Sequence, residues 1–174
     1  MLSRSRGAGG AAGIAPLELD ANLGVNGYTS ADMIRVELPA LAAVQPGFAS
    51  ILVGVNDVVQ GVAAGAYEAN LRATFARLLD RLPAGRLVAV STPDYTVTPR
   101  GADFGDPVRL TRRIAAFNAI MARVSSGLGV RHVDILDLSR SAAGDRSLVA
   151  EDGLHPSGRQ YGMWVERIAP VVAE

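Results

Sequence analysis

The chain has 174 residues, of which 49% are hydrophobic and 20% charged, a composition typical of one folded domain with a substantial core. Seventeen Lys and Arg residues balance seventeen Asp and Glu residues and are interspersed with them, so no basic surface for nucleic acid or an anionic membrane is indicated. The absence of cysteine excludes disulfides, a thiolate nucleophile and thiolate metal ligands, and no apolar run is long enough to span a membrane. We therefore expect one domain, residues 1–174, that acts on a small neutral or mixed-charge molecule.

The first 16 residues have the composition of an irregular segment rich in small residues. Arginines near its start are followed by Gly and Ala, which make a poor signal-peptide core, so we predict a cytoplasmic location unless a signal peptide precedes Met1. Gly7, Gly9 and Ala12 mimic the glycine spacing of a dinucleotide-binding loop. That loop needs a preceding strand, and the first six residues have no strand pattern, so a nucleotide-binding module is the weaker hypothesis.

Four short apolar runs have the pattern of strands that are buried on both faces. They are rich in Val, Ile and Leu and cover residues 17–24, 48–55, 86–92 and 130–136. Between them, helical periodicity places apolar residues on one face in 67–82 and in 108–124. The second of these helices opens with Asp106 as N-cap and Pro107 at its first position, and we expect it to end near Gly127 and Gly129.

Two further helices complete the pattern. One is predicted to begin at Thr29 or Ser30, where Thr29 and Asp32 have the spacing of a capping box, and to be interrupted or restarted at Pro39. The other is predicted from about Ser157 to Val172. Strands that alternate with helices predict parallel strands joined by right-handed crossovers, and hence a doubly wound α/β sheet that binds ligands beyond the carboxyl ends of its strands.

Glycines and polar residues gather where those strands are expected to end. "GVNGYTS" (24–30) and "GVNDV" (54–58) each follow an apolar run, and "EDGLHPSGRQY" (151–161) precedes the last helix. Taken singly, Gly27 fits a turn with positive φ, Asn56 a turn cap, and His155 the neighbour of a helix start. Asp134 and Asp137 fit turn and capping carboxylates, and we expect no catalytic role for them. The long connection 93–106 is expected either to shape a substrate pocket or to be a plain surface loop.

Taken in order, these segments resemble the SGNH hydrolases, also called GDSL esterases and lipases. "NLGVNGYTSADM" resembles that family's glycine block, "GVNDV" its Gly-x-Asn-Asp block and "DGLHPSGRQY" its Asp-x-x-His-Pro block, over about residues 17–165. The resemblance implies a flavodoxin-like three-layer fold and hydrolysis of a small-molecule ester without a metal or organic cofactor. It implies His155 as general base, Asp152 as its orienting acid, and the Gly27 N–H and the Asn56 amide as oxyanion-hole donors.

The sequence departs from the family's pattern at the nucleophile, because no Gly-Asp-Ser block occurs in the 174 residues. Five of the chain's serines are considered for this role, and none has a strand or nucleophile elbow that suits it, so the nucleophile stays unassigned; the five are Ser3, Ser5, Ser30, Ser91 and Ser157. In the family that block ends a first, central strand between the strands that correspond to 17–23 and 48–53. We expect this strand to be missing, since residues 1–14 are rich in Gly and Ala.

Two interpretations follow from the missing block. In the first, the chain is an ester hydrolase whose N-terminal part is truncated or whose reading frame is started late. In the second, it is a nucleophile-free relative that binds an acyl or glycan ligand.

Overall fold

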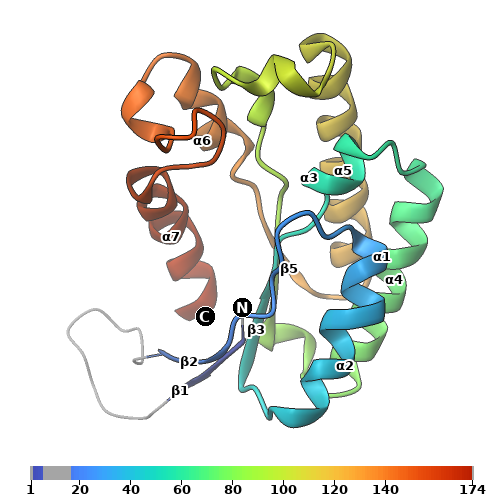
Figure 1. The fold of residues 1–174 in the computed structure, drawn as a ribbon. Coiled ribbons are helices and arrows are strands. Elements are labelled where there is room, and N and C mark those ends of the chain that lie inside the picture. The colour runs from blue at the N-terminus through green and yellow to red at the C-terminus, as the bar shows by residue number, and fades with distance from the viewer. Residues whose placement is uncertain (1, 6–16, 174) are drawn as a thin grey trace.

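A computed structural model describes residues 2–5 and 17–173 as a sheet with helices on both faces (Figure 1). The sheet has the strand order β2-β1-β3-β4-β5. Its strands are β1 (Leu2–Ser5), β2 (Leu17–Ala21), β3 (Phe48–Ile51), β4 (Leu87–Val90) and β5 (Arg131–Val133). β3, β4 and β5 pair in parallel, which confirms the predicted α/β architecture.

The centre of the sheet differs in part from the expectation. β1 lies between β2 and β3 and is antiparallel to both, with Leu2 opposite Ala21 on one side and Ala49 on the other. The interpretation of residues 1–16 as irregular is therefore wrong for residues 2–5. The low strand propensity expected of this segment is outweighed at residues 2–5, because the two flanking strands offer backbone hydrogen-bonding partners on both edges. Within the described ranges, no parallel strand occupies this position, and the glycine-rich stretch 7–13 lies outside them.

The four predicted helical regions occur in the predicted order, together with two short helices, 55–59 and 136–140, that were not predicted. The helices are α1 (Ser30–Asp32), a π-helical segment (Met33–Glu37), α2 (Leu38–Ala40), α3 (Val55–Val59), α4 (Ala64–Leu79), α5 (Pro107–Gly127), α6 (Leu136–Arg140) and α7 (Gly158–Ala173). Single 3₁₀ turns cover Leu41–Ala43, Ala84–Arg86, Tyr95–Val97, Gly101–Phe104, Ser141–Ala143 and Arg146–Leu148. The N-cap of α5 is confirmed, because the Asp106 carboxylate accepts the Arg109 N–H at 2.7 Å.

The helical run after Thr29 shows both the predicted cap and an irregularity near Pro39. The capping box is present: Thr29 Oγ1 accepts the Asp32 N–H, and Asp32 Oδ2 accepts the Thr29 N–H at 3.0 Å. The run does not break at Pro39. Instead it widens to a π-helix over Met33–Glu37, and the Leu38 N–H donates to the Met33 carbonyl. Proline has no N–H and crowds the preceding turn, and the wider helix accommodates it.

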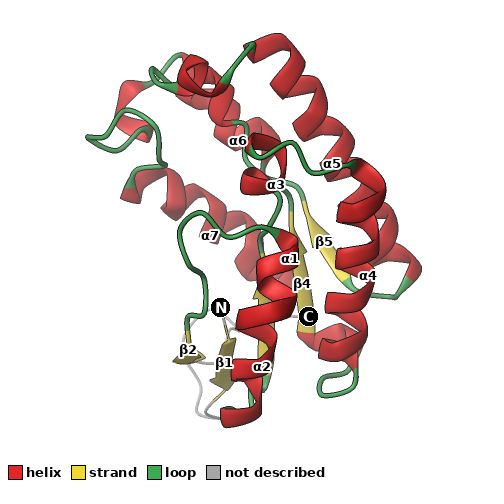
Figure 2. Cartoon of the chain, turned by 45° about the vertical axis from the view of Figure 1, so that its right-hand side comes forward, coloured by secondary structure: helices red, strands yellow, loops and turns green. Residues whose placement is uncertain are grey.

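The core lies in two layers, one on each face of the sheet. On one face, α4 and α5 cover a large cluster in which the rings of Tyr67 and Phe117 stack with centroids 4.4 Å apart. On the other face lies α7 (Figure 2), which covers a smaller cluster that includes Trp164. Alternate residues of β4 serve the two layers, with Leu87 in the first and Val88 in the second. No helix in the described ranges has the length and apolar character needed to cross a membrane.

Candidate active site

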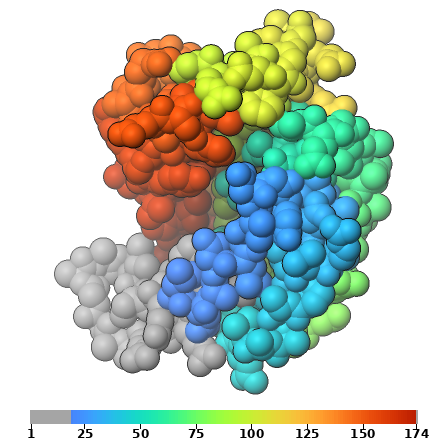
Figure 3. All heavy atoms as spheres, viewed as in Figure 1, coloured from blue at the N-terminus to red at the C-terminus, as the bar shows by residue number. Residues whose placement is uncertain are grey.

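A cavity of about 470 Å³ opens at the carboxyl ends of the parallel strands. Its wall takes residues from all three segments singled out in the sequence: 24–28, 54–56 and 154–156. The predicted convergence of these segments on one crevice is thus confirmed. Pro93, Tyr95 and Phe104 also line the cavity, which confirms that the connection 93–106 shapes the pocket. Figure 3 shows the hollow between the orange and red C-terminal part and the blue segment near residue 25.

His155 and Asp152 form a hydrogen-bonded pair at the rim of this cavity. His155 Nδ1 lies 2.5 Å from Asp152 Oδ2, and the two side chains are 55% and 45% exposed. The other carboxylate oxygen accepts the N–H groups of Leu154 at 2.9 Å and His155 at 3.0 Å. The hydrogen bond from the His155 side chain, followed by these two backbone donors, holds the pKa of Asp152 well below its usual range. A carboxylate at Nδ1 leaves Nε2 of a neutral imidazole as the proton acceptor.

Two backbone hydrogen bonds hold the loop that carries Asp152 and His155. Gly153, with φ of +75°, makes the turn between the acid and the histidine. Its carbonyl accepts the N–H of Arg100 at 3.1 Å, so the connection 93–106 holds the turn. The N–H of Ala150 donates to the carbonyl of His155 at 2.8 Å and closes the loop. The contact with Arg100 joins residues far apart in sequence and has no sequence signal.

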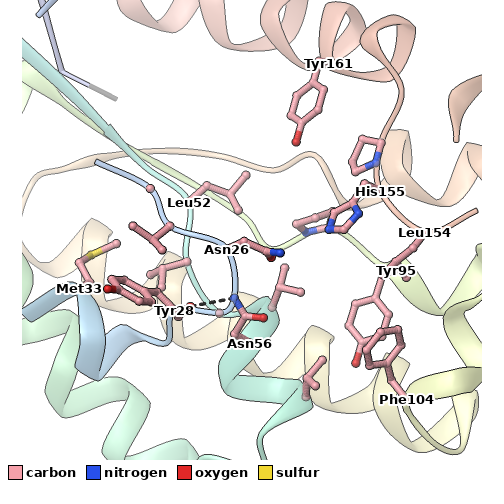
Figure 4. Close-up of a pocket in the computed structure, with 18 of the residues that line it drawn as sticks. Asn26, Tyr28, Met33, Leu52, Asn56, Tyr95, Phe104, Leu154, His155 and Tyr161 are labelled. Carbon is pink, nitrogen blue, oxygen red and sulfur yellow. Dashed lines mark hydrogen bonds between the residues drawn. The ribbon is translucent and has the colours of Figure 1, made fainter. Parts of the chain in front are cut away.

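The glycine turn lies on the opposite side of the cavity. Tyr28 N–H donates to the Val25 carbonyl at 3.2 Å, and Gly27 takes the positive φ of +85° that this turn requires. Gly27 itself lies beside the cavity, whereas its neighbour Asn26 lines it and points its amide toward the imidazole of His155 (Figure 4). The structure thus places the turn against the crevice, with Asn26 and not Gly27 in the cavity wall.

Helix α3 and its C-cap residue Gln60 hold this turn through two side-chain amides. Asn56 Nδ2 donates to the Tyr28 carbonyl and Gln60 Nε2 to the Gly27 carbonyl, each at 2.9 Å. An amide nitrogen carries two hydrogens, so Asn56, which lines the cavity, keeps one for a bound ligand. Sequence reasoning missed Gln60, although its spacing of four residues from Asn56 places both on one helix face.

A buried carboxylate ties α3 to the start of α1. Asp57 is fully buried and accepts the Ser30 N–H at 2.9 Å and the Ser30 hydroxyl at 2.5 Å. Asn70 in turn donates to the Ser30 hydroxyl at 3.0 Å. Two consecutive residues of "GVNDV" therefore have different environments: Asn56 lines the cavity, and Asp57 lies in the protein interior.

The candidate nucleophiles are placed as follows. The described residues that line the cavity include no serine. Ser30 and Ser91 are fully buried, and Ser91 donates to Asp134 at 2.8 Å. Ser157 donates to the backbone carbonyl of Ser147 at 2.7 Å. The side chains of Ser3 and Ser5 in β1 lie outside what the structure describes.

Of the two acidic residues set aside in the sequence, Asp134 has the expected role in a turn, whereas Asp137 forms an ion pair instead of a cap. Asp134 accepts the Leu136 N–H at 2.9 Å in a turn, and Asp137 pairs with Arg167 on the surface. Neither lines the cavity. In residues 2–5 and 17–173, no three His, Asp or Glu side chains form a group that could hold a metal ion.

Comparison with known proteins points in the same direction as the motifs. The model of the GDSL-like Lipase/Acylhydrolase family matches residues 6–163. The crystal structure of LAE5, an α/β hydrolase enzyme from the metagenome of Lake Arreo, Spain, superposes with a TM-score of 0.68 at 17% identity, over 84% of this chain and 68% of that one. Axe2, an acetylxylan esterase from Geobacillus stearothermophilus, gives 0.66 at 18% identity over the same shares. No curated protein sequence matches the chain.

Proposed function

We propose that this chain, which belongs to the GDSL-like lipase/acylhydrolase family, is the base and oxyanion-hole part of a serine ester hydrolase. The observation that carries the proposal is the hydrogen-bonded pair of Asp152 and His155 at the edge of a cavity that Asn56 also lines. A general base needs a free ring nitrogen and a partner that fixes its tautomer. The contact at Nδ1 supplies the partner and leaves Nε2 for the reacting hydroxyl.

Each residue has a stated step in this proposal. His155 takes the proton of a serine hydroxyl as that oxygen attacks the ester carbonyl, and Asp152 stabilises the imidazolium that forms. Asn56 and the Gly27 N–H donate to the oxyanion of the tetrahedral intermediate. His155 then protonates the leaving alcohol, and water hydrolyses the acyl-enzyme by the same route. The bond from Asn56 to the Tyr28 carbonyl supports this role, because it fixes the amide before any charge develops.

The mechanism also needs a nucleophilic serine, and these 174 residues contain no Gly-Asp-Ser block to supply it. We propose that a segment encoded upstream of Met1 carries it. In that case the preceding DNA continues in frame and encodes Gly-Asp-Ser after an apolar run. The second candidate function is binding of an acyl or glycan ligand without hydrolysis, and it is favoured by the absence of serine from the described wall of the cavity.

Fluorophosphonate labelling separates the two functions. We expect the 174-residue chain to remain unlabelled, and a chain extended to the Gly-Asp-Ser codons to be labelled at one serine and to hydrolyse p-nitrophenyl acetate. His155→Ala in the extended chain removes both activities. Single-site labelling of the 174-residue chain would place the nucleophile within it and refute the upstream serine. Stop codons immediately upstream, combined with ligand binding and no turnover, would favour the second function.

The oxyanion role of Asn56 has its own test in the extended chain. Asn56→Ala is expected to lower kcat by about 10²-fold or more with little change in KM, because its amide acts mainly on the charge that develops during reaction. A loss confined to KM would assign Asn56 to substrate binding instead.

A further inference from the structure

A buried carboxylate, Asp94, lies at the start of the connection 93–106. Its side chain is fully buried, and no step of the proposed mechanism uses it. Asp94 Oδ1 accepts the N–H of Thr96 at 3.2 Å and the hydroxyl of Thr96 at 2.6 Å, and Oδ2 accepts Arg140 Nε at 2.9 Å. The N–H of Asp94 donates to the Ser139 hydroxyl at 2.8 Å. A buried charge needs such partners, so they fix the start of the connection against α6.

Helix α5 belongs to the same network. The Thr111 hydroxyl lies 2.7 Å from that of Thr96 and 3.3 Å from Asp94 Oδ2. Tyr95, between the two anchored residues of the connection, lines the cavity, and its ring meets that of Phe104 edge-on with centroids 5.7 Å apart (Figure 4). Asp94 therefore ties this part of the cavity wall to two helices, α5 and α6, without lining the cavity itself.

The tip of the connection packs directly on the turn that Asp94 anchors. A Cβ at Gly101 would lie 2.5 Å from the carbonyl oxygen of Tyr95 and 2.6 Å from that of Thr96. Only a residue without a side chain permits two backbone segments to approach so closely. The position of Gly101, and of its neighbour Arg100, is therefore set by the turn at Tyr95–Val97.

Arg100 carries this chain of contacts to the loop of the acid and the histidine. Its N–H donates to the Gly153 carbonyl at 3.1 Å. Its side chain covers the same residue, since a Cβ at Gly153 would lie 3.3 Å from Arg100 Cγ. Gly153 directly follows Asp152 and precedes His155 by two residues. Close-packed contacts transmit a displacement, so a shift at the start of the connection reaches this loop.

We propose that Asp94 is a positioning residue of the active site. It holds the connection 93–106 in the place from which Arg100 sets the loop of His155 against Asn56. Asp94 acts through these contacts and does not touch the reacting atoms. A misplacement of about 1 Å that originates far from the chemistry can lower a rate by about 10²-fold. The inference rests on the proposed function for what the loop does.

The structural part of the proposal is tested in the 174-residue chain by amide hydrogen exchange. Asp94→Asn keeps the shape of the side chain and removes the charge that pairs with Arg140. Exchange of the Arg100 N–H is expected to accelerate at least about tenfold more than that of Phe117, because the bond to Gly153 opens locally. Phe117 lies in the core of α5 and reports overall opening. Equal acceleration of both amides would reveal only a loss of overall stability and overturn the proposal.

Gly101→Ala tests the link without altering the buried charge. Gly101 has no positive φ, so the new Cβ acts only by pushing the tip away from the carbonyls of Tyr95 and Thr96. The same local acceleration at Arg100 is expected. The control Gly85→Ala, with nothing within 4 Å of the new Cβ, should leave this exchange unchanged. Unchanged exchange of Arg100 in folded Gly101→Ala refutes the link, even where Asp94→Asn fails to fold.

The catalytic part is tested in the chain extended to the Gly-Asp-Ser codons. Asp94→Asn and Gly101→Ala are expected to lower kcat for p-nitrophenyl acetate by about 10²-fold while the circular dichroism spectra stay native. Asp137→Asn removes an exposed pair with Arg167 outside the cavity and should keep kcat within about twofold. An undiminished kcat in the folded Asp94 and Gly101 variants would show that the network does not position the catalytic loop.

The two proposals fail separately. Local opening at Arg100 in a protein that never hydrolyses an ester, even when extended, would make the proposed function wrong and leave Asp94 as the residue that places the loop. Hydrolysis by the extended chain, with kcat unchanged in the folded Asp94 and Gly101 variants, would do the reverse.

Discussion

The buried contact between Asp57 and Ser30 gives a prediction that needs only the folded chain. In Asp57→Asn, the amide keeps the shape of the carboxylate but replaces one acceptor oxygen by a donor. Its remaining oxygen can still accept the fixed Ser30 N–H, which now lies 2.9 Å from the carboxylate. The new NH₂ then faces the Ser30 hydroxyl, which already accepts from Asn70. The hydroxyl therefore loses its acceptor inside the protein.

The size of the effect follows from that geometry. A hydrogen bond to a charged group contributes about 1.5–3 kcal/mol, and an unsatisfied buried donor costs a similar amount. We expect Asp57→Asn to lower the free energy of unfolding by about 2 kcal/mol, which in a chain of this size lowers Tm by about 6 °C. Full burial of Asp57 means that water cannot replace the lost partner.

Urea denaturation followed by circular dichroism measures this loss. The matched control is Asp137→Asn, at a carboxylate whose side chain is 65% exposed and pairs with Arg167 on the surface. Exposed pairs contribute little, so the control should change stability by at most about 0.5 kcal/mol. Equal stabilities of the two variants would show that the carboxylate of Asp57 does not hold the start of α1, and the reasoning would fail.

Three further outcomes follow from single positions. Gly54→Ala is expected to lower the free energy of unfolding, measured by urea denaturation, by about 2 kcal/mol or more, because φ is +131° and a Cβ would lie 2.5 Å from Thr92 Oγ1. The control Gly65→Ala, with open space around the new Cβ, should cause no loss of stability. Burial lowers the pKa of His132, so the unfolded chain binds a proton at this residue more readily than the folded chain does. The free energy of unfolding should therefore fall as the pH drops below about 6.5, and His132→Gln should flatten this decline. An unchanged pH profile in the variant would refute this role of His132. In an ester-hydrolysing form of the protein, Asp152→Asn should lower kcat by about 10⁴-fold with an unchanged circular dichroism spectrum, and a near-native kcat would remove Asp152 from the mechanism.

The parts of the fold that sequence could predict are those with a local cause. Helix α5 is an example, because Asp106 and Pro107 specify its start within one turn. The position of β1 could not be predicted, since residues 2–5 pair through backbone groups with strands on either side. The π-helical segment before Pro39 is intermediate: proline signals a disturbance, but whether the helix breaks or widens depends on the packing around it.

The candidate site shows the same difference between contacts with a local cause and contacts that depend on long-range packing. Asp152 and His155 are three residues apart, so their pairing could be expected from the sequence, and the structure places them in contact. The contact of Gln60 with Gly27 spans 33 residues and that of Asp57 with Ser30 spans 27. Such partners depend on how the segments are brought together, which a periodic pattern does not specify.

The spacing of polar residues on α3 and its C-cap residue Gln60 explains how a five-residue helix can position the glycine turn. Asn56 binds the carbonyl of Tyr28, Asp57 binds Ser30, and Gln60 binds the carbonyl of Gly27. A helix this short has little stability of its own, so its order and that of the turn depend on each other. Donors fixed in this way need no reorganisation when a negative charge develops on a bound carbonyl, which is the condition under which an oxyanion hole lowers a barrier.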